Sequence, residues 1–457
     1  MRSLDPDDLA EWTSGYWRSG LKPAPISGFC FDARKIENGQ CFVALSSGTR
    51  DGHDFAGQAE KGGASALFVE RTVDADLPQL VVHDTLEAMA KIAQRIRSLF
   101  RHPVVGITGS SGKTSTKEMM HSLLGIEKTH TNRGNWNNRI GVPMTLFGLD
   151  DECHDYAVIE AGINQPKEMS ELGEMIKANL CMITNIGPAH LELLGSLEGI
   201  ASEKSLLFEK AAPDAEMILT ADTFEYEAFS RFADRSIVLA NEGEEVSPEP
   251  KRVIRYAIES DLPRQTRVSL ESESFHLATA SKGIATNAAL AITAARYLGI
   301  SETQIKEQIE QWQPAEDRGQ WITAGDQSFY VDCYNANPAS MADAIEAFVL
   351  SSDASRPRGY ILGAMNELGD AAVEWHKKSG GCLQLREIDY AWFIGPSALI
   401  LAYAAGAISN GADAEQIHLF EDVEKAKSSV AQFSGDLFLK GSRSYQLEKL
   451  LAVDQLT

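Results

Sequence analysis

The sequence predicts an α/β protein of three domains, and three observations lead to this prediction. The chain has 457 residues, and at about 150 residues per domain this length favours three domains. Short apolar runs alternate with helix-forming stretches, which is typical of a parallel, doubly wound sheet. Hydrophobic residues make up 44% and charged residues 23%, a globular composition that excludes a disordered or collagen-like chain.

Residues 1–84 are predicted to form a small N-terminal α/β domain. Three short apolar runs are strand candidates, at 41–45, 66–70 and 80–82. A short helix is expected at 55–62, between the first two strands.

Residues 85–314 are predicted to form the central domain. Apolar residues at helical spacing predict a helix over 85–100, which ends before Pro103. A buried strand at 104–108, a glycine-rich turn and a helix at 113–124 follow. Two further buried strands, an antiparallel hairpin and an alanine-rich helix are expected, at 156–160, 180–185, 253–280 and 285–298.

Residues 315–457 are predicted to form a Rossmann-like C-terminal domain. The stretch 313–319, Q-P-A-E-D-R-G, resembles a linker. A second strand–helix series begins near Gln320, and its strand candidates are 328–333, 359–363, 390–395 and 437–440.

The net charge and the apolar pattern exclude several classes of partner. With 65 acidic and 42 basic residues the formal charge is −23, so duplex nucleic acid and anionic membranes should repel the chain. No stretch approaches the length of a membrane span. The first residues are acidic and lack the apolar core of a secretory signal, and the six cysteines are scattered. We therefore expect a cytoplasmic protein with reduced thiols and no membrane or nucleic-acid partner. We also expect the chain to be a monomer.

The strongest chemical signal is the segment 106–117, G-I-T-G-S-S-G-K-T-S-T-K. A strand, a glycine-rich turn and a helix N-terminus together form an anion site, because the first N–H groups of a helix point at the phosphates. Lys113 would balance phosphate charge and the Thr114 hydroxyl would bind Mg²⁺. Ile107 stands where the strict phosphate-loop pattern has its first glycine. The expected nucleotide contacts are Gly109, Ser110, Ser111, Gly112, Lys113, Thr114 and Ser115.

Three single residues carry weaker signals. Glu160 ends a predicted strand, where a carboxylate beside a nucleotide is a natural Mg²⁺ ligand. His190 follows the next strand, and Lys204 lies in a helix-forming stretch. Taken alone, each is as well explained by a structural or surface role.

Several motifs, in chain order, carry a resemblance to the Mur ligase family. Besides the glycine-rich loop, they include T-N-R-G-N-W-N-N-R-I-G-V-P, Y-N-A-N-P-A-S-M, L-G-A-M-N-E-L-G and K-G-S-R-S, at 131–143, 334–341, 362–369 and 440–444. The stretches 32–45 and 51–55 are similar to the N-terminal domain of the family. The resemblance covers nearly the whole chain.

This resemblance implies three domains that bind a uridine nucleotide, bind ATP, and close over the site. It also implies roles for single residues. Thr114 and Glu160 would hold one Mg²⁺, and His190 and a carbamylated Lys204 would hold a second. Asn287, Arg318 and Asp332 would contact ATP. The remaining motif residues would contact the other substrates: Arg34, Asp51, His53, Asn137, Asn138, Tyr334, Asn335 and Asn337.

The implied activity is ATP-dependent amide ligation through an acyl phosphate, with Lys113, Glu160, His190 and Lys204 as catalytic residues. D-Alanyl-D-alanine would be the amine and UDP-N-acetylmuramoyl-tripeptide the acid. A related ligase with another acceptor, including a folylpolyglutamate-type enzyme, and an inactive nucleotide-binding protein are the alternatives. The chain departs from the family pattern at several positions: Ala33, Gln165, Lys167, Leu206, Ser281-Lys282-Gly283 and Ala364.

Overall fold

A computed structural model describes residues 3–451 of the chain. Within this range one compact unit comprises 3–108, 124–181 and 205–216, and a second comprises 109–123, 182–204 and 217–451. Their sheets have five, nine and six strands, with an additional two-stranded ribbon. The predicted α/β fold class is therefore confirmed.

The five-stranded sheet lies in the N-terminal part of the first unit, and its strand order is β1-β7-β6-β3-β2. All neighbours are parallel except β1 and β7. Helix α2 (Ala56–Lys61) packs on it through Ala56 and Ala59. The strands, with the ribbon β4–β5, are β1 (Tyr16–Trp17), β2 (Gly28–Cys30), β3 (Gln40–Val43), β4 (Ser46–Ser47), β5 (Arg50–Asp51), β6 (Ala66–Val69) and β7 (Gln79–Val81).

The nine-stranded sheet has the order β16-β15-β14-β13-β12-β11-β8-β10-β9. Strand β8 is parallel to β10, and Glu160 at the end of β10 lies opposite Ile107. The glycine-rich loop starts two residues after Ile107, so Glu160 lies at the edge of the sheet where this loop leaves β8. The strands are β8 (Val104–Thr108), β9 (Thr129–Thr131), β10 (Tyr156–Glu160), β11 (Leu180–Ile183), β12 (Glu216–Thr220), β13 (Ser236–Ala240), β14 (Arg252–Leu262), β15 (Gln265–Leu270) and β16 (Glu273–Leu277).

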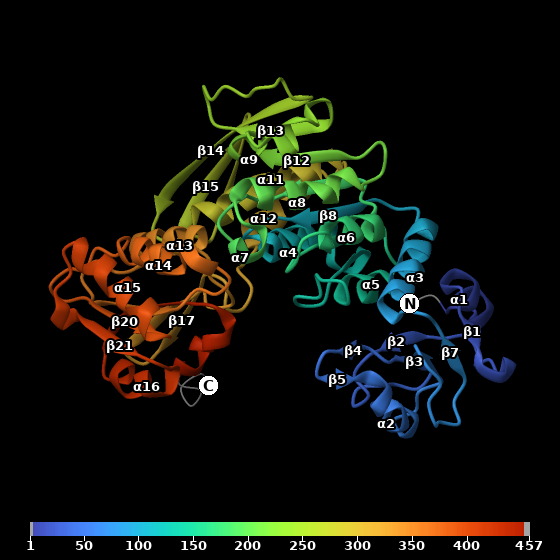
Figure 1. Cartoon of the computed structure of the whole chain (residues 1–457). Coiled ribbons are helices and arrows are strands. Elements are labelled where there is room, and N and C mark those ends of the chain that lie inside the picture. Colours follow the sequence, from blue (N-terminus) through green and yellow to red (C-terminus); the bar gives the residue numbers. More distant parts are fainter. Residues whose placement is uncertain (1–2, 452–457) are drawn as a thin grey trace. The chain divides into compact units, whose positions relative to one another are not determined.

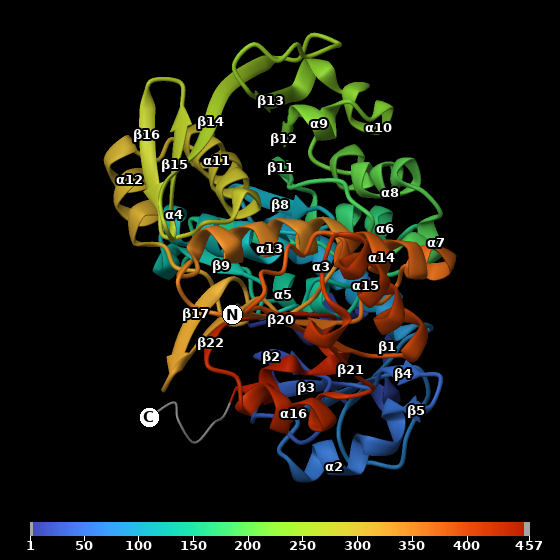
Figure 2. The ribbon, with the colours of Figure 1, turned by 90° about the vertical axis from the view of Figure 1, so that its left-hand side faces the viewer.

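Most predicted elements of the central region are present, and several features differ. The stretch predicted as a hairpin is a three-stranded antiparallel meander, β14-β15-β16. Strands β12 and β13 were not predicted, because a short apolar run does not distinguish a strand from a buried helix segment. Helix α11 (Lys282–Tyr297) begins three residues early because Ser281 accepts a hydrogen bond from the N–H of Ile284 and caps it. Helices α11 and α12 (Glu302–Gln311) lie against β15 and β16, as Figure 2 shows.

The last sheet has six strands in the order β17-β18-β22-β19-β20-β21, and helices cover both of its faces. Figure 1 shows α13, α14 and α15 on one face and α16 on the other. All pairs are parallel except β17 with β18. The strands are β17 (Gln320–Ala324), β18 (Gln327–Val331), β19 (Arg358–Gly363), β20 (Tyr390–Ile394), β21 (Ile417–Phe420) and β22 (Gly435–Lys440).

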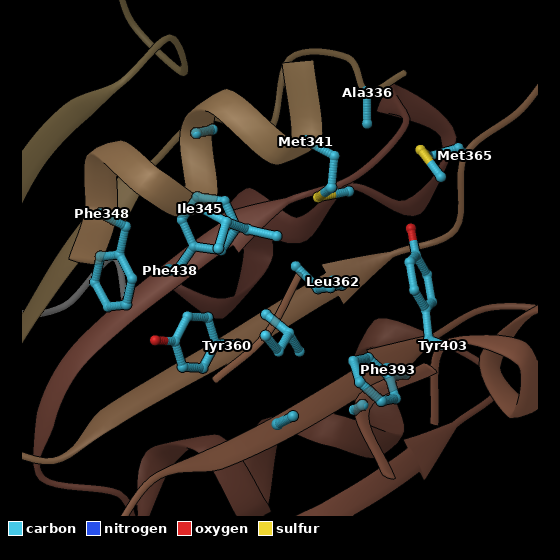
Figure 3. Packing of buried hydrophobic residues seen from close by; sticks show 14 of the residues in the cluster. Ala336, Met341, Ile345, Phe348, Tyr360, Leu362, Met365, Phe393, Tyr403 and Phe438 are labelled. Atoms are coloured by element: carbon cyan, nitrogen blue, oxygen red, sulfur yellow. The ribbon is translucent and has the colours of Figure 1, made fainter. Parts of the chain in front are cut away.

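A cluster of aromatic side chains forms the core beneath α13 (Figure 3). Phe348 of α13 lies over Tyr360 of β19 and Phe438 of β22, with ring centroids 5.3 and 5.4 Å apart. Burying one such side chain stabilises the fold by roughly 1.5–3 kcal/mol, so this cluster fixes α13 on the sheet.

The remaining helices connect the strands. No helix within residues 3–451 is both long and apolar enough to cross a membrane. The α-helices are α1 (Pro6–Thr13), α3 (Thr85–Leu99), α4 (Lys113–Leu124), α5 (Gly141–Leu146), α6 (Glu168–Ile176), α7 (Leu191–Leu194), α8 (Leu197–Glu209), α9 (Ala221–Phe224), α10 (Glu227–Ser230), α13 (Pro338–Ser351), α14 (Ala372–Gly380), α15 (Ser397–Ser409) and α16 (Val423–Ala431).

Candidate active site

The glycine-rich loop between β8 and α4 has backbone conformations that only glycine adopts without strain. Gly109 has φ +155° and Gly112 has φ +77°. The Lys113 ammonium donates a hydrogen bond to the carbonyl of Gly109, at 2.9 Å, so its charge lies inside the loop. Ser115 is buried in the first turn of α4. The loop thus has the strand, turn and helix N-terminus that a phosphate site requires.

Two residues that follow β11 hold this loop in place. The Ser110 N–H donates to the carbonyl of Asn185 at 3.0 Å, and the Ser111 N–H donates to the Asn185 side-chain oxygen at 2.9 Å. The Thr184 hydroxyl donates to the carbonyl of Ser111 at 2.5 Å. These contacts connect residues more than 70 positions apart in the chain and preorganise the loop.

A cavity of about 300 Å³ lies beside the loop. It is lined mainly by polar groups, which include Asn185, Asp222, Asn241, Tyr256 and Asn287. The Asn287 amide lies so close to Gly112 that a Cβ there would come within 2.3 Å of its nitrogen. Asn287, expected near the base of the nucleotide, therefore lies between the loop and the cavity.

Arg318 is a second predicted nucleotide contact that the structure brings to this loop. Its guanidinium donates to the Thr114 hydroxyl at 3.1 Å and lies over the Tyr334 ring, 4.0 Å from the ring centroid. Thr114, Arg318 and Tyr334 thus form one group, although the last two were predicted from different motifs.

Glu160 is buried in the first unit and is held by two asparagines of the 131–143 motif. The Asn137 amide donates to its Oε1 at 2.6 Å, and the Glu160 N–H donates to Asn132 Oδ1 at 2.6 Å. Asn138 instead accepts hydrogen bonds from the N–H groups of Ile140 and Gly141 and shapes the turn before α5. Asn137 fixes the predicted metal-binding carboxylate, and Asn138 fixes the backbone.

His190 adopts the left-handed conformation, with φ 57°, and its Nδ1 lies 2.5 Å from Oε2 of Glu367. Glu367 has φ 63° and lies in the motif L-G-A-M-N-E-L-G. Non-glycine residues adopt this region only rarely, and here two of them contact each other. The contact keeps Nδ1 engaged, which leaves Nε2 of His190 for another partner.

Lys204 is fully buried in α8. Among the described residues, its Nζ has no hydrogen-bond partner. Burial holds the pKa of Lys204 well below its usual value, and the charge of Lys113 lowers it further. A buried amine without a partner is costly, so this position needs a functional or chemical explanation.

Magnesium, bound together with a nucleotide, is the metal that the sequence predicts for this site. No group of three or more His, Cys, Asp and Glu side chains suited to a metal occurs in the described part of the chain. Mg²⁺ in nucleotide sites needs only one or two protein ligands, since phosphate oxygens and water supply the others. The orphaned Nζ of Lys204 is a nitrogen group, which Mg²⁺ does not prefer, so Lys204 fits the metal only if it is converted to an oxygen ligand.

The predicted residues of the C-terminal domain lie at the end of β18 and the start of α13. Asp332 Oδ2 pairs with Nζ of Lys440 at 2.5 Å. Asn335 Oδ1 accepts from the N–H of Ala336. Asn337 caps α13 through the N–H of Ser340, and its amide points to the carbonyl of Ser110 at 3.4 Å. Asn337 thus reaches the phosphate loop.

The predicted residues of the N-terminal domain are largely engaged with one another. His53 is buried, with Nδ1 2.6 Å from Asp51 Oδ1 and Nε2 accepting the N–H of Glu70 at 2.9 Å. Arg71 pairs with the other oxygen of Asp51. Arg34 is exposed and pairs with Asp32. Both ring nitrogens of His53 are therefore used within the protein.

Sequence reasoning missed Thr184, Asn185 and Glu367 as site residues. All three lie in segments with a signal, because two directly follow a strand and the third lies in a recognised motif. Strand ends at this edge of a doubly wound sheet are where ligands bind. The roles predicted for the other residues stay predictions.

The fold and the loop together define a nucleotide-binding α/β protein, and comparison with known proteins gives its family. The Mur ligase middle domain matches residues 107–295, and the Mur ligase glutamate ligase domain matches 317–442. The chain belongs to the Mur ligase family.

Several relatives share almost the full length of the chain. UDP-N-acetylmuramoyl-tripeptide–D-alanyl-D-alanine ligase of Escherichia coli K12 is 32% identical over 435 residues, 92% of each chain. The ligase of that name from Synechocystis is 30% identical over 428 residues, 92% of this chain and 90% of the relative. A crystal structure of MurF from Acinetobacter baumannii superposes with a TM-score of 0.86 at 30% identity, covering 100% of this chain and 99% of that one. The structure of MurF from Thermotoga maritima in complex with ADP superposes with a TM-score of 0.77 at 25% identity, and covers 93% of this chain and 96% of that one.

Proposed function

We propose that this chain is an ATP-dependent, ADP-forming ligase that joins D-alanyl-D-alanine to UDP-N-acetylmuramoyl-tripeptide. The preorganised loop from Gly109 to Lys113, beside a polar cavity of about 300 Å³, is the observation that carries the proposal. Relatives named for this reaction match over more than nine-tenths of the chain. We assign the uridine nucleotide to residues 1–84, ATP to 85–314, and closure over the site to 315–457.

The chemical problem is that a carboxylate is a poor electrophile. Transfer of the γ-phosphoryl group of ATP to the peptide carboxylate forms an acyl phosphate and releases ADP. The amine of D-alanyl-D-alanine attacks the acyl carbon, phosphate leaves, and the attacking nitrogen loses a proton. Such a transfer needs positioning and charge neutralisation more than a protein nucleophile.

The residues of this chain would supply both the positioning and the charge neutralisation. The loop N–H groups and the Lys113 ammonium bind phosphate oxygens, and Arg318 orients the Thr114 hydroxyl. Closing of the C-terminal domain excludes water, which would otherwise hydrolyse the acyl phosphate. Thr114 and Glu160 would hold one magnesium ion, and His190 and a carbamylated Lys204 would hold a second. Magnesium neutralises phosphate charge when it is bound.

For Lys204 the proposal includes carbamylation by CO₂. Nζ attacks the carbon of CO₂ and loses a proton, which gives a carbamate with two oxygens. The carbamate replaces a buried amine that lacks a partner with a carboxylate-like ligand of the kind that Mg²⁺ prefers.

Phosphate release by the purified protein, with ATP, Mg²⁺ and UDP-N-acetylmuramoyl-tripeptide, tests the proposal. We expect release with D-alanyl-D-alanine and little with D-glutamate, L-lysine or diaminopimelate. The Lys113→Ala variant provides the blank, because it lacks the charge that neutralises the transferred phosphoryl group. A clear preference for one of the three amino acids would assign the chain to another ligase, and no release with any acceptor would indicate an inactive nucleotide-binding protein.

A further inference from the structure

The N-terminus of helix α11 is bound by a carboxylate from a distant part of the chain. Asp343, in α13, accepts the Ser281 hydroxyl at 2.6 Å through Oδ2 and the N–H of Gly283 at 2.9 Å through Oδ1. Ser281 also accepts the N–H of Ile284, so its hydroxyl both caps α11 and binds Asp343. A negative charge at this end of a helix is favourable, because the first N–H groups and the helix dipole point toward it.

The next turn of the same helix faces the nucleotide cavity. Gly283, Thr286 and Asn287 line the cavity, and Asn287 lies against Gly112 of the phosphate loop. One turn of α11 therefore contacts Asp343, and the following turn contacts the loop.

The three residues at this end of α11 depart from the family pattern, and each has a contact with α13. Ser281 provides the hydroxyl that binds Asp343. Lys282 pairs with Glu346 at 2.6 Å. Gly283 provides an accessible N–H, since a Cβ there would lie only 3.0 Å from a carboxylate oxygen of Asp343.

We propose that Asp343 is a positioning residue for the nucleotide site, because it holds α11 so that Asn287 faces the cavity. Through Asp343, the contact between α13 and α11 is coupled to nucleotide binding. The inference rests on the proposed function, because it takes the ligand of the cavity to be a nucleotide. Coupling between two sites is reciprocal. A nucleotide that fixes α11 therefore favours the contact of α13 with α11. Conversely, loss of the Asp343 contact weakens nucleotide binding.

ADP affinity of the full-length protein, measured by isothermal titration calorimetry, tests this coupling. For Asp343→Ala we expect about tenfold weaker binding, which corresponds to 1.4 kcal/mol. Ser281→Gly keeps most of the helix cap, because glycine is tolerated at this position, and should weaken binding about fivefold. The double variant should bind like Asp343→Ala, since the Ser281 hydroxyl then has lost its acceptor.

Glu346→Gln is the matched control on the same helix. It breaks the Lys282 ion pair, whose side chains are 56% and 51% exposed, and exposed pairs contribute little. ADP affinity should stay within twofold of wild type. If Asp343→Ala does not fold, Asp343→Asn, which keeps the volume and one acceptor, replaces it with an expected loss of about threefold.

Two results would overturn the inference. One is ADP affinity of the Asp343 variant within twofold of wild type. The other is a double variant in which the two single effects multiply, because Ser281 and Asp343 would then act separately. A wild-type protein that does not bind ADP would instead refute the proposed function, and this inference with it.

Discussion

Replacement of Gly109 by alanine should strongly weaken nucleotide binding, and the structure gives the size of the effect. Gly109 has φ +155°, a conformation that other residues rarely adopt. A Cβ there would lie 1.8 Å from the Thr184 hydroxyl oxygen and 3.0 Å from the Thr184 Cβ. Thr184 is buried and its hydroxyl binds the carbonyl of Ser111, so it cannot move away without losing that bond.

Three costs contribute to the effect of Gly109→Ala. Backbone strain costs about 1–3 kcal/mol, overpacking about 1–3 kcal/mol, and a lost hydrogen bond about 0.5–1.5 kcal/mol. A total cost of about 3 kcal/mol for holding the mutant loop in its binding conformation lowers ADP affinity more than roughly 100-fold.

Calorimetric titration with ADP and thermal unfolding provide the assay. Gly125→Ala is the matched control at the other end of α4: φ is +93°, but no atom lies within 4 Å of the added Cβ. The control should lose about 1–2 kcal/mol of stability from strain and keep ADP affinity within twofold. If Gly109→Ala binds ADP within threefold of wild type, the loop tolerates a side chain and the reasoning is wrong.

Three further predictions concern buried polar groups. Lys204→Ala should be inactive in phosphate release, and short carboxylic acids should partly restore activity by replacing the carbamate oxygens. Burial lowers the pKa of His130 to about 4, below the value of about 6.5 in the unfolded chain. Between these two pH values the unfolded state binds more protons than the folded state. The stability contribution of His130 is therefore complete above pH 6.5 and is lost as the pH falls towards 4. Urea unfolding should show a loss of about 2 kcal/mol at pH 5 that is absent in His130→Gln. Arg97 is buried and donates to three carbonyls and to the Asn179 side chain, so Arg97→Met should lower the free energy of unfolding by about 3–5 kcal/mol.

Different results would contradict these three predictions. Normal activity of Lys204→Ala without added acid would make Lys204 a structural residue. An equal pH slope in wild type and His130→Gln would place the titration elsewhere. A loss below about 1 kcal/mol in Arg97→Met would mean that the four acceptors are satisfied without the guanidinium.

The local sequence was sufficient for the phosphate loop. Strand 104–108, the glycines and the helix from Lys113 were all predicted, and the structure has β8 and α4 at these positions. They are encoded within about 20 consecutive residues, where glycine conformation, apolar runs and helix starts leave a direct signal. The family followed from motifs in chain order for the same reason.

Other site features come from residues far apart in the chain, and no local pattern contains them. The contacts between Asp343 and Ser281, between Glu367 and His190, and between Arg318 and Thr114 each span more than 60 positions. Their partners are selected by sheet order and by the packing of α13 on its aromatic core.

The sequence by itself determined the α/β class, the phosphate loop and the family of this protein. Only the tertiary structure decided that Lys204 is buried without a hydrogen-bond partner among the described residues and that both ring nitrogens of His53 are occupied. Burial and hydrogen-bond partners are properties of the assembled fold, because each depends on side chains that the chain brings together only when it folds.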